Sequence, residues 1–157
     1  AQLDRFMFKL VIEYPTAAEE DDILRLHCRK EFAEGTIDAQ VQPLLDAQRI
    51  GRIQSLCRDV LVDDKIVGYI NAIVRKTREW PAFYLGASPR AGIAILNAAR
   101  VLAAFAGRPY VIPDDVVELA IPALCHRVIL SPEAEVEGET ADRSLLSMLK
   151  TIEVPRL

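Results

Sequence analysis

The sequence has 157 residues, of which just over half are hydrophobic and only 6% are aromatic, and its formal net charge is −4. This length suits one domain and part of a second, and an apolar content drawn mostly from Ala, Val, Ile and Leu favours a helical bundle. The negative charge argues against a general nucleic-acid surface. Because no apolar run reaches the roughly 18 residues of a membrane span, membrane insertion is excluded as well.

Three widely spaced cysteines, Cys28, Cys57 and Cys125, are typical of a reducing compartment, so we expect a cytoplasmic protein. Two of them adjoin a histidine, in the pairs formed with His27 and His126. Adjacent residues on a helix point about 100° apart, so neither pair can chelate a metal ion naturally. We therefore expect buried thiols and no metal site.

The first 36 residues predict the end of an α/β core. The chain starts without Met or a signal-peptide pattern, so we expect it to be part of a longer protein. Residues 6–14 form a nearly continuous apolar run that ends at Pro15, which is typical of a strand buried on both faces of a parallel sheet. No second strand of this kind follows, so its sheet is expected upstream. Thr16 and Glu19 form a capping box that opens a predicted helix over residues 16–30.

The remaining sequence predicts a linker and then a helical domain. Residues 37–44 are predicted to be the linker, with Pro43 limiting any helix, and the helical domain is expected over residues 45–157. Asp63 and Ser88 are expected to cap helices within it, and Pro122 is expected to kink or restart one. Helices are predicted over residues 45–57, 64–80, 88–106, 113–120 and 141–151, with an irregular acidic stretch over residues 131–139.

Several catalytic motifs are missing from the sequence. It contains no Gly-rich loop followed by Lys-Ser or Lys-Thr, which would cradle phosphates, and no Asp-Glu pair at the end of a hydrophobic strand, which would hold Mg²⁺. It also contains no Ser/His/Asp or Cys/His set with a defined local signature. Nothing in this chain is therefore expected to hold ATP or Mg²⁺ by itself.

Two arginines are candidates for binding an anion. Arg90 follows Ser88 and Pro89 in the first turn of a predicted helix. A cation at this place is disfavoured by the helix dipole, so Arg90 is a candidate for binding an external anion, which the helix N-terminus also stabilises. Arg5 lies just before the predicted strand, at the rim of a sheet, where ligand sites gather. The alternatives stay open from the residues alone: Arg90 could pair with a neighbouring carboxylate, and Arg5 with Asp4 in a solvated ion pair.

Short motifs in order along essentially the whole chain resemble the MoxR family of AAA+ ATPases. Residues 1–15 resemble the segment that leads into the last strand of the family's nucleotide-binding core, and residues 86–91 resemble its sensor 2 motif. Further similar motifs, at family-like spacing, are Thr77-Arg78, residues 107–111, residues 113–116, His126-Arg127, residues 132–135 and residues 154–156.

The resemblance implies a mainly α fold, in which a lid bundle of about four helices is preceded by a strand and helix left over from an α/β core. It implies that Arg5 is the arginine finger, which reaches a neighbour's γ-phosphate, and that Arg90 is sensor 2. Arg78, Arg108 and Arg127 also match family positions, and we expect structural roles for them.

The resemblance also implies what the whole protein does. A full-length relative would use ATP and Mg²⁺ to drive chaperone-like maturation or metal insertion in partner proteins. It would form a ring, commonly a hexamer, and von Willebrand factor A-domain proteins are the expected partner class. Two alternatives remain: a non-enzymatic helical interaction module, and a lid of the MCM-like or magnesium-chelatase-like branch. A phosphate-binding loop upstream would separate the ATPase from the module.

We predict that this chain alone shows no ATPase activity, because nothing in it grips the β-phosphate or Mg²⁺. The measurement is phosphate release by the purified chain, with a mock purification from the same host as the control for contaminating ATPases. Turnover above that background would contradict the prediction that the chain lacks the motifs that hold ATP and Mg²⁺.

Overall fold

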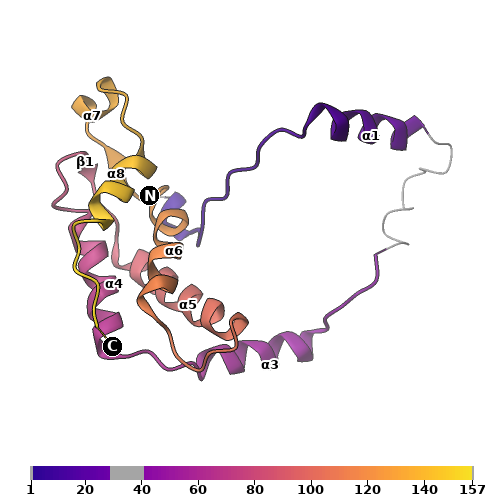
Figure 1. Cartoon of the computed structure of the whole chain (residues 1–157), viewed down its shortest axis with the longest axis horizontal. Coiled ribbons are helices and arrows are strands. Elements are labelled where there is room, and N and C mark those ends of the chain that lie inside the picture. Colours follow the sequence, from indigo (N-terminus) through magenta and orange to yellow (C-terminus); the bar gives the residue numbers. More distant parts are fainter. Residues whose placement is uncertain (1, 29–40, 157) are drawn as a thin grey trace. The chain divides into compact units, whose positions relative to one another are not determined.

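The computed structural model describes residues 2–28 and 41–156. The fold is mainly α, as predicted: the described elements are one 3₁₀ turn, seven α-helices and two short strands (Figure 1). In chain order they are η1 (Leu3–Arg5), α1 (Ala17–Cys28), α3 (Ala47–Arg58), α4 (Asp64–Lys76), β1 (Phe83–Leu85), α5 (Pro89–Phe105), α6 (Pro113–Leu124), β2 (Ile129–Leu130), α7 (Pro132–Val136) and α8 (Ala141–Leu149). No helix in these ranges is both long enough and apolar enough to cross a membrane.

Contacts divide the chain into two compact units. One consists of Ala1–Leu10 together with Ile53–Leu157, and the other is Val11–Arg52. Residues 1–10, which the sequence assigns to the end of an α/β core, therefore contact the helical bundle in this chain. The predicted boundaries at residues 36 and 45 stay predictions for the longer protein.

The smaller unit contains α1 and the first residues of α3. The predicted capping box is confirmed, because the Glu19 carboxylate accepts hydrogen bonds from both the backbone N–H and the hydroxyl of Thr16 at 2.7 Å. Helix α1 is described up to Cys28, so the predicted helix end at residue 30, the first part of the predicted linker and the residues between them lie outside the described ranges. Asp46 then accepts from the backbone N–H of Arg49 at 2.7 Å and caps the start of α3.

The predicted strand over residues 6–14 is wrong for this chain, since these residues have no regular secondary structure. A strand needs a neighbour to pair its backbone groups, and the two described strands pair with each other. The backbone groups of this segment find other partners: the Phe6 carbonyl accepts from Arg127, and the Lys9 N–H donates to the Pro122 carbonyl at 2.9 Å.

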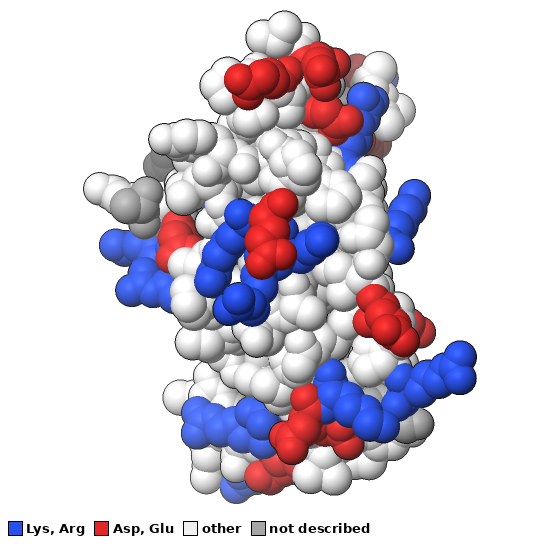
Figure 2. All heavy atoms as spheres, turned by 90° about the vertical axis from the view of Figure 1, so that its left-hand side faces the viewer, with Lys and Arg blue, Asp and Glu red and all other residues white. Residues whose placement is uncertain are grey.

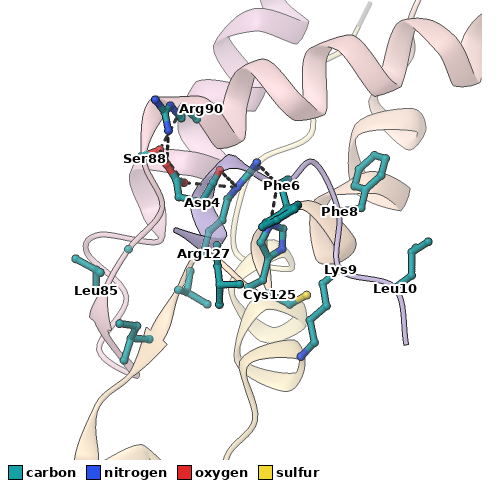
Figure 3. A pocket seen from close by; sticks show the side chains of 15 residues that line it. Asp4, Phe6, Phe8, Lys9, Leu10, Leu85, Ser88, Arg90, Cys125 and Arg127 are labelled. Atoms are coloured by element: carbon teal, nitrogen blue, oxygen red, sulfur yellow. Dashed lines mark hydrogen bonds and ion pairs between the residues drawn. The ribbon is translucent and has the colours of Figure 1, made fainter. Parts of the chain in front are cut away.

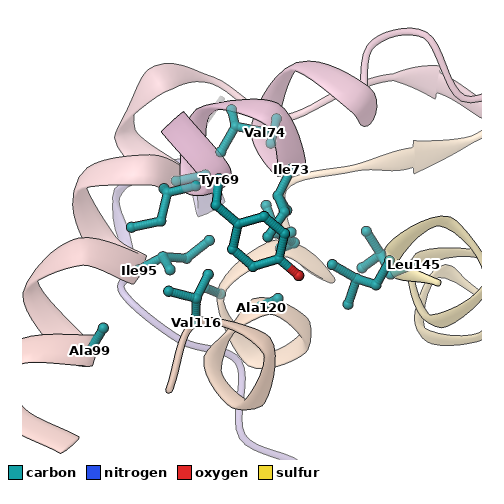
Figure 4. Packing of buried hydrophobic residues seen from close by; sticks show 14 of the residues in the cluster. Tyr69, Ile73, Val74, Ile95, Ala99, Val116, Ala120 and Leu145 are labelled. Carbon is teal, nitrogen blue, oxygen red and sulfur yellow. The ribbon is translucent and has the colours of Figure 1, made fainter. Parts of the chain in front are cut away.

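The core of the larger unit lies among α4, α5, α6 and α8. Helix α5 packs against both α4 and α6, and α6 also contacts α4 and α8. Asp63 caps α4 as predicted, accepting from the Lys65 N–H at 2.8 Å. Tyr69 lies among the aliphatic side chains of this core (Figure 4), and burial is the main cause that raises its pKa. The buried side chains of α4 are Ile66, Tyr69, Ile70, Ile73 and Val74, whereas the apolar Val67 is half-exposed.

Helix α5 is rich in alanine on its packed side, which allows its neighbours to approach closely. Its apolar character all round predicts a helix surrounded by others, but Ile93 and Phe105 are exposed at 59% and 79%. The helix ends as predicted, with Gly107 at φ 69° after the last turn.

The C-terminal third of the chain differs from the prediction in three respects. Helix α6 continues through Pro122 to Leu124 without restarting. The acidic stretch at 131–139 contains the short helix α7, which Ser131 caps by accepting from the Ala134 N–H. Just before it, β2 pairs antiparallel with β1, and this two-stranded sheet was not predicted because each strand is too short to show an alternating pattern.

We predict that Gly86→Ala lowers the free energy of unfolding by about 1–3 kcal/mol, because overpacking forces the backbone to shift. A Cβ at Gly86 would lie 2.6 Å from the backbone nitrogen of Arg78. The measurement is urea denaturation of this chain. The matched control is Gly68→Ala in α4, where nothing lies within 4 Å of an added Cβ. That change is expected to stabilise the helix by up to about 1 kcal/mol, and equal effects of the two substitutions would contradict the prediction.

Candidate functional site

The N-terminus of α5 forms one wall of the candidate site. Ser88 is the N-cap and Pro89 the first helical residue, as the sequence predicts. The Ser88 hydroxyl oxygen accepts from the Arg90 N–H at 3.2 Å and also lies 3.0 Å from both carboxylate oxygens of Asp4, to which its hydrogen is donated. The Arg90 side chain is 67% exposed, and its guanidinium lies 3.9 Å from the Asp4 carboxylate. This distance makes a weak, solvent-screened pair, so Arg90 keeps its capacity to bind an external anion.

Arg127, which follows α6, forms the buried floor of the site (Figure 3). Its side chain is only 2% exposed. The guanidinium donates to three backbone carbonyls: Nε to Asp4 at 3.2 Å, Nη2 to Phe6 at 2.6 Å and Nη1 to Ala123 at 3.2 Å. Burial is the main cause that lowers the pKa of Arg127, and the Asp4 carboxylate opposes this shift by favouring the charged form.

Asp4 links these two arginines. Its carboxylate lies 3.5 Å from Nε of Arg127 and 3.9 Å from Nη1 of Arg90. One carboxylate therefore serves two guanidinium groups, and this neighbourhood carries an excess of positive charge. The sequence predicts a solvated pair of Asp4 with Arg5 as one alternative, whereas the described ion pairs of Asp4 are with Arg90 and Arg127.

Arg5 is exposed at the end of η1, and its guanidinium lies 5.7 Å from the centre of the Phe6 ring. Arg5 and Arg90 line the same small pocket of about 220 Å³. The remaining lining residues are Asp4, Met7, Ile93, Ala94, Asn97 and Arg127. The structure thus brings together the two arginines singled out from the sequence and adds a third, buried one, so the pocket can receive a small anionic group such as a phosphate.

A larger pocket of about 1050 Å³ adjoins this cluster (Figure 3). Its lining is largely apolar and includes Phe6, Phe8 and Cys125 beside Asp4 and Arg90. Figure 2 shows basic and acidic side chains interleaved over one face of the molecule, without a broad basic patch among the described residues visible there. The charge arrangement therefore suits a compact anion better than a long polyanion.

Sequence reasoning singled out Arg5 and Arg90 but missed Asp4 as the carboxylate that lies between Arg90 and Arg127. The only available signal was the position of Asp4 beside Arg5, and a contact with Ser88 across such a sequence separation leaves no local pattern. Arg78 and Arg108, for which structural roles are predicted, make structural contacts. Arg78 donates to the Ala87 carbonyl at 2.9 Å, and Arg108 forms a two-pronged ion pair with Asp115 at 2.6 and 2.9 Å.

No group of three or more His, Cys, Asp or Glu side chains that could hold a metal ion occurs in residues 2–28 and 41–156. His126 instead makes a hydrogen bond of 2.9 Å between Nε2 and the Phe6 carbonyl. The guanidinium groups of Arg5 and Arg90, together with the positive end of the α5 dipole, suit this site to binding an anion.

Comparison with known proteins places this geometry in a family. Residues 75–147 match the AAA lid domain family, and this range contains Ser88, Arg90 and Arg127. The chain is 33% identical over its full length to the chaperone MoxR1 of Mycobacterium tuberculosis, of which it covers 42%. The chain carries an AAA lid region and is similar over its whole length to the matching part of MoxR-family proteins.

Two further similarities agree with this result. The chain is 40% identical to the uncharacterized protein YeaC of Bacillus subtilis, over 99% of its own length and 47% of that protein. A crystal structure of a proposed ATPase from Cytophaga hutchinsonii matches with a TM-score of 0.85 and 29% identity, covering 99% of this chain and 48% of that one. The chain thus spans about half the length of the relatives it matches.

The environment of Cys125 allows a test of the larger pocket. Burial is the main cause that raises the pKa of this thiol, and the nearby charge of Asp142 raises it further. Cys28 is exposed. We predict that iodoacetamide at pH 8 alkylates Cys28 several times faster than Cys125, as followed by mass spectrometry of peptides. In urea the two rates should converge, and equal rates in the folded chain would contradict the burial of Cys125.

Proposed function

We propose that the full-length protein is an ATP-hydrolysing, MoxR-type chaperone and that this chain supplies two of its phosphate-contacting residues, Arg5 as the arginine finger and Arg90 as sensor 2. The observation that carries the proposal is their common pocket at the N-terminus of α5. These residues are far apart in the sequence, and the fold places both beside one positively charged cavity in an AAA lid region.

The geometry gives each arginine a distinct task. Arg90 lies at a helix N-terminus, where the positive end of the helix dipole and the guanidinium both favour a negative charge. Arg5 is exposed and supported by the Phe6 ring, so its planar group is free to donate to phosphate oxygens outside this chain. Phosphoryl transfer requires positive charge near the equatorial oxygens of the transferred group, which an arginine supplied by a neighbouring subunit can provide.

Because Arg5 and Arg90 line one pocket, we assign both to the same nucleotide, held by the neighbouring subunit of a ring. The motifs that hold ATP and Mg²⁺ would lie in the part of the longer protein that is outside this chain. The expected hexamer, the cytoplasmic location and a partner of the von Willebrand factor A-domain class are parts of the same proposal and rest on the similarity to MoxR proteins.

In the full-length protein, Arg5→Ala is expected to slow ATP hydrolysis by about 10³–10⁵-fold and to leave nucleotide binding largely intact, because the arginine acts on charge that develops in the transition state. Arg90→Ala is expected to slow hydrolysis and also to weaken the preference for ATP over ADP, because a cation near the γ-phosphate already distinguishes the two ligands in the ground state. Steady-state hydrolysis and nucleotide titrations measure both effects.

Subunit mixing supplies the decisive arm of this experiment. Arg5→Ala subunits mixed with subunits inactivated in the Mg²⁺-binding acidic motif should regain partial activity. At some subunit boundaries, an intact Arg5 from the second variant then faces intact ATP-holding motifs of the first. Arg143→Ala is the control, since Arg143 is an exposed arginine of α8 outside both pockets. Normal hydrolysis by Arg5→Ala, or dead rings despite confirmed mixing, would show that Arg5 is not the finger.

A further inference from the structure

The backbone on both sides of Arg5 is held by the buried side chain of Arg127, and His126 adds a hydrogen bond of 2.9 Å between Nε2 and the Phe6 carbonyl. The Arg127 guanidinium donates to the carbonyl of Asp4 at 3.2 Å and to that of Phe6 at 2.6 Å, and these two carbonyls flank Arg5 on either side. Its third hydrogen bond goes to the carbonyl of Ala123 in the last turns of α6. One planar group therefore fastens both sides of residue 5 to the end of α6.

These hydrogen bonds require a buried charge, which costs desolvation free energy, and another side chain cannot easily reproduce them. A guanidinium that is 2% exposed loses its hydration, and the loss is offset only if its donors find well-placed acceptors. The fork of an arginine can reach several acceptors at once with fixed geometry, which an ammonium group cannot do. The 3₁₀ turn that carries Arg5 has only three residues, too few to hold a fixed position without external contacts.

The same segment is also fastened from the other side. The Asp4 carboxylate accepts from the hydroxyl of Ser88, the N-cap of α5, and lies within ion-pair distance of Arg127. The first turn of α5 carries Arg90. Residues 4–6 thus lie between the end of α6 and the start of α5, and each of the two helices contributes its own contact.

We infer that Arg127 is a positioning residue for the Arg5 finger: it fixes the backbone on both sides of Arg5 and so places the guanidinium that contacts the neighbour's phosphate. This inference rests on the proposed function. Its physical basis is that a displacement of about 1 Å at a catalytic group can cost on the order of 10²-fold in rate, and Arg127 is the described side chain that ties both flanking carbonyls.

The test is a double-mutant cycle of Arg5→Ala and Arg127→Met in the full-length ring, with single-turnover hydrolysis of radiolabelled ATP as the readout. Arg127→Met alone should lower the single-turnover rate, and kcat in parallel steady-state assays, by about 10²-fold. The steady-state KM for ATP should stay within a few-fold, because the holding motifs lie elsewhere. In the Arg5→Ala background the same substitution should have little further effect, because residues that act as one unit are strongly non-additive.

The matched control is Arg108→Met, which removes another arginine paired with a carboxylate in the same bundle, away from both pockets that Arg127 lines. It should lower Tm and leave kcat per folded ring unchanged. Subunit mixing gives a second readout, the recovery of hydrolysis, which is not expected if Arg127 only stabilises the fold. Arg127→Met subunits should be complemented by subunits dead in the Mg²⁺-binding motif, as expected for a defect of the finger.

The outcomes separate the two claims. A full additional loss when Arg127→Met is added to Arg5→Ala would overturn the positioning role and leave the proposed function standing. Normal hydrolysis by Arg5→Ala would overturn the proposed function itself. If Arg127→Met fails to assemble, the cycle is run with Arg127→Lys, which keeps the charge and loses the fork. The inference is supported if Arg127→Lys lowers kcat in the wild-type background and causes no further loss in the Arg5→Ala background. A wild-type kcat for Arg127→Lys overturns it.

Discussion

The buried guanidinium of Arg127 is the constraint on which the candidate site depends. Three backbone carbonyls satisfy it, two from residues 4–6 and one from α6, and the Asp4 carboxylate balances its charge. A charge enclosed in this way requires all of these partners at once, because each unmet donor would leave an uncompensated polar group in the interior. The position of the N-terminal segment on the bundle follows from this requirement.

The packing of α5 explains why the second arginine meets this segment. Small side chains such as Ala91 and Ala99 are fully buried and let α5 lie close to α4 and α6. Ser88 ends the preceding loop by capping the helix, and the same hydroxyl reaches Asp4. Residues 88–90 therefore start the helix and pair with Asp4, and Arg90, which carries the charge of this stretch, also lines the small pocket.

Local rules in the sequence were sufficient for most helices and insufficient for the contacts between distant segments. The caps at Thr16, Asp63 and Ser88 were predicted, because N-cap chemistry is decided within four residues. The strand predicted over residues 6–14 fails because apolar pattern alone does not provide a pairing partner. Arg5 and Arg90 came from their places beside a predicted strand and a helix start. The role of Asp4 between Arg90 and Arg127 depends on tertiary packing that no local pattern records.

The hydrogen bonds of Arg127 also bear on what counts as a domain in this chain. The match to the AAA lid family begins at residue 75, yet two of the three carbonyls that accept hydrogen bonds from its buried arginine come from residues 4 and 6. In this chain the compact unit that contains the lid match is thus discontinuous, because a peptide from far upstream completes its interior. A polypeptide cut at the start of the family match would expose Arg127 to water and lose the support of the first turn of α5. A shortened protein, or a chimera that contains this lid, therefore has to include the upstream peptide with residues 4–6.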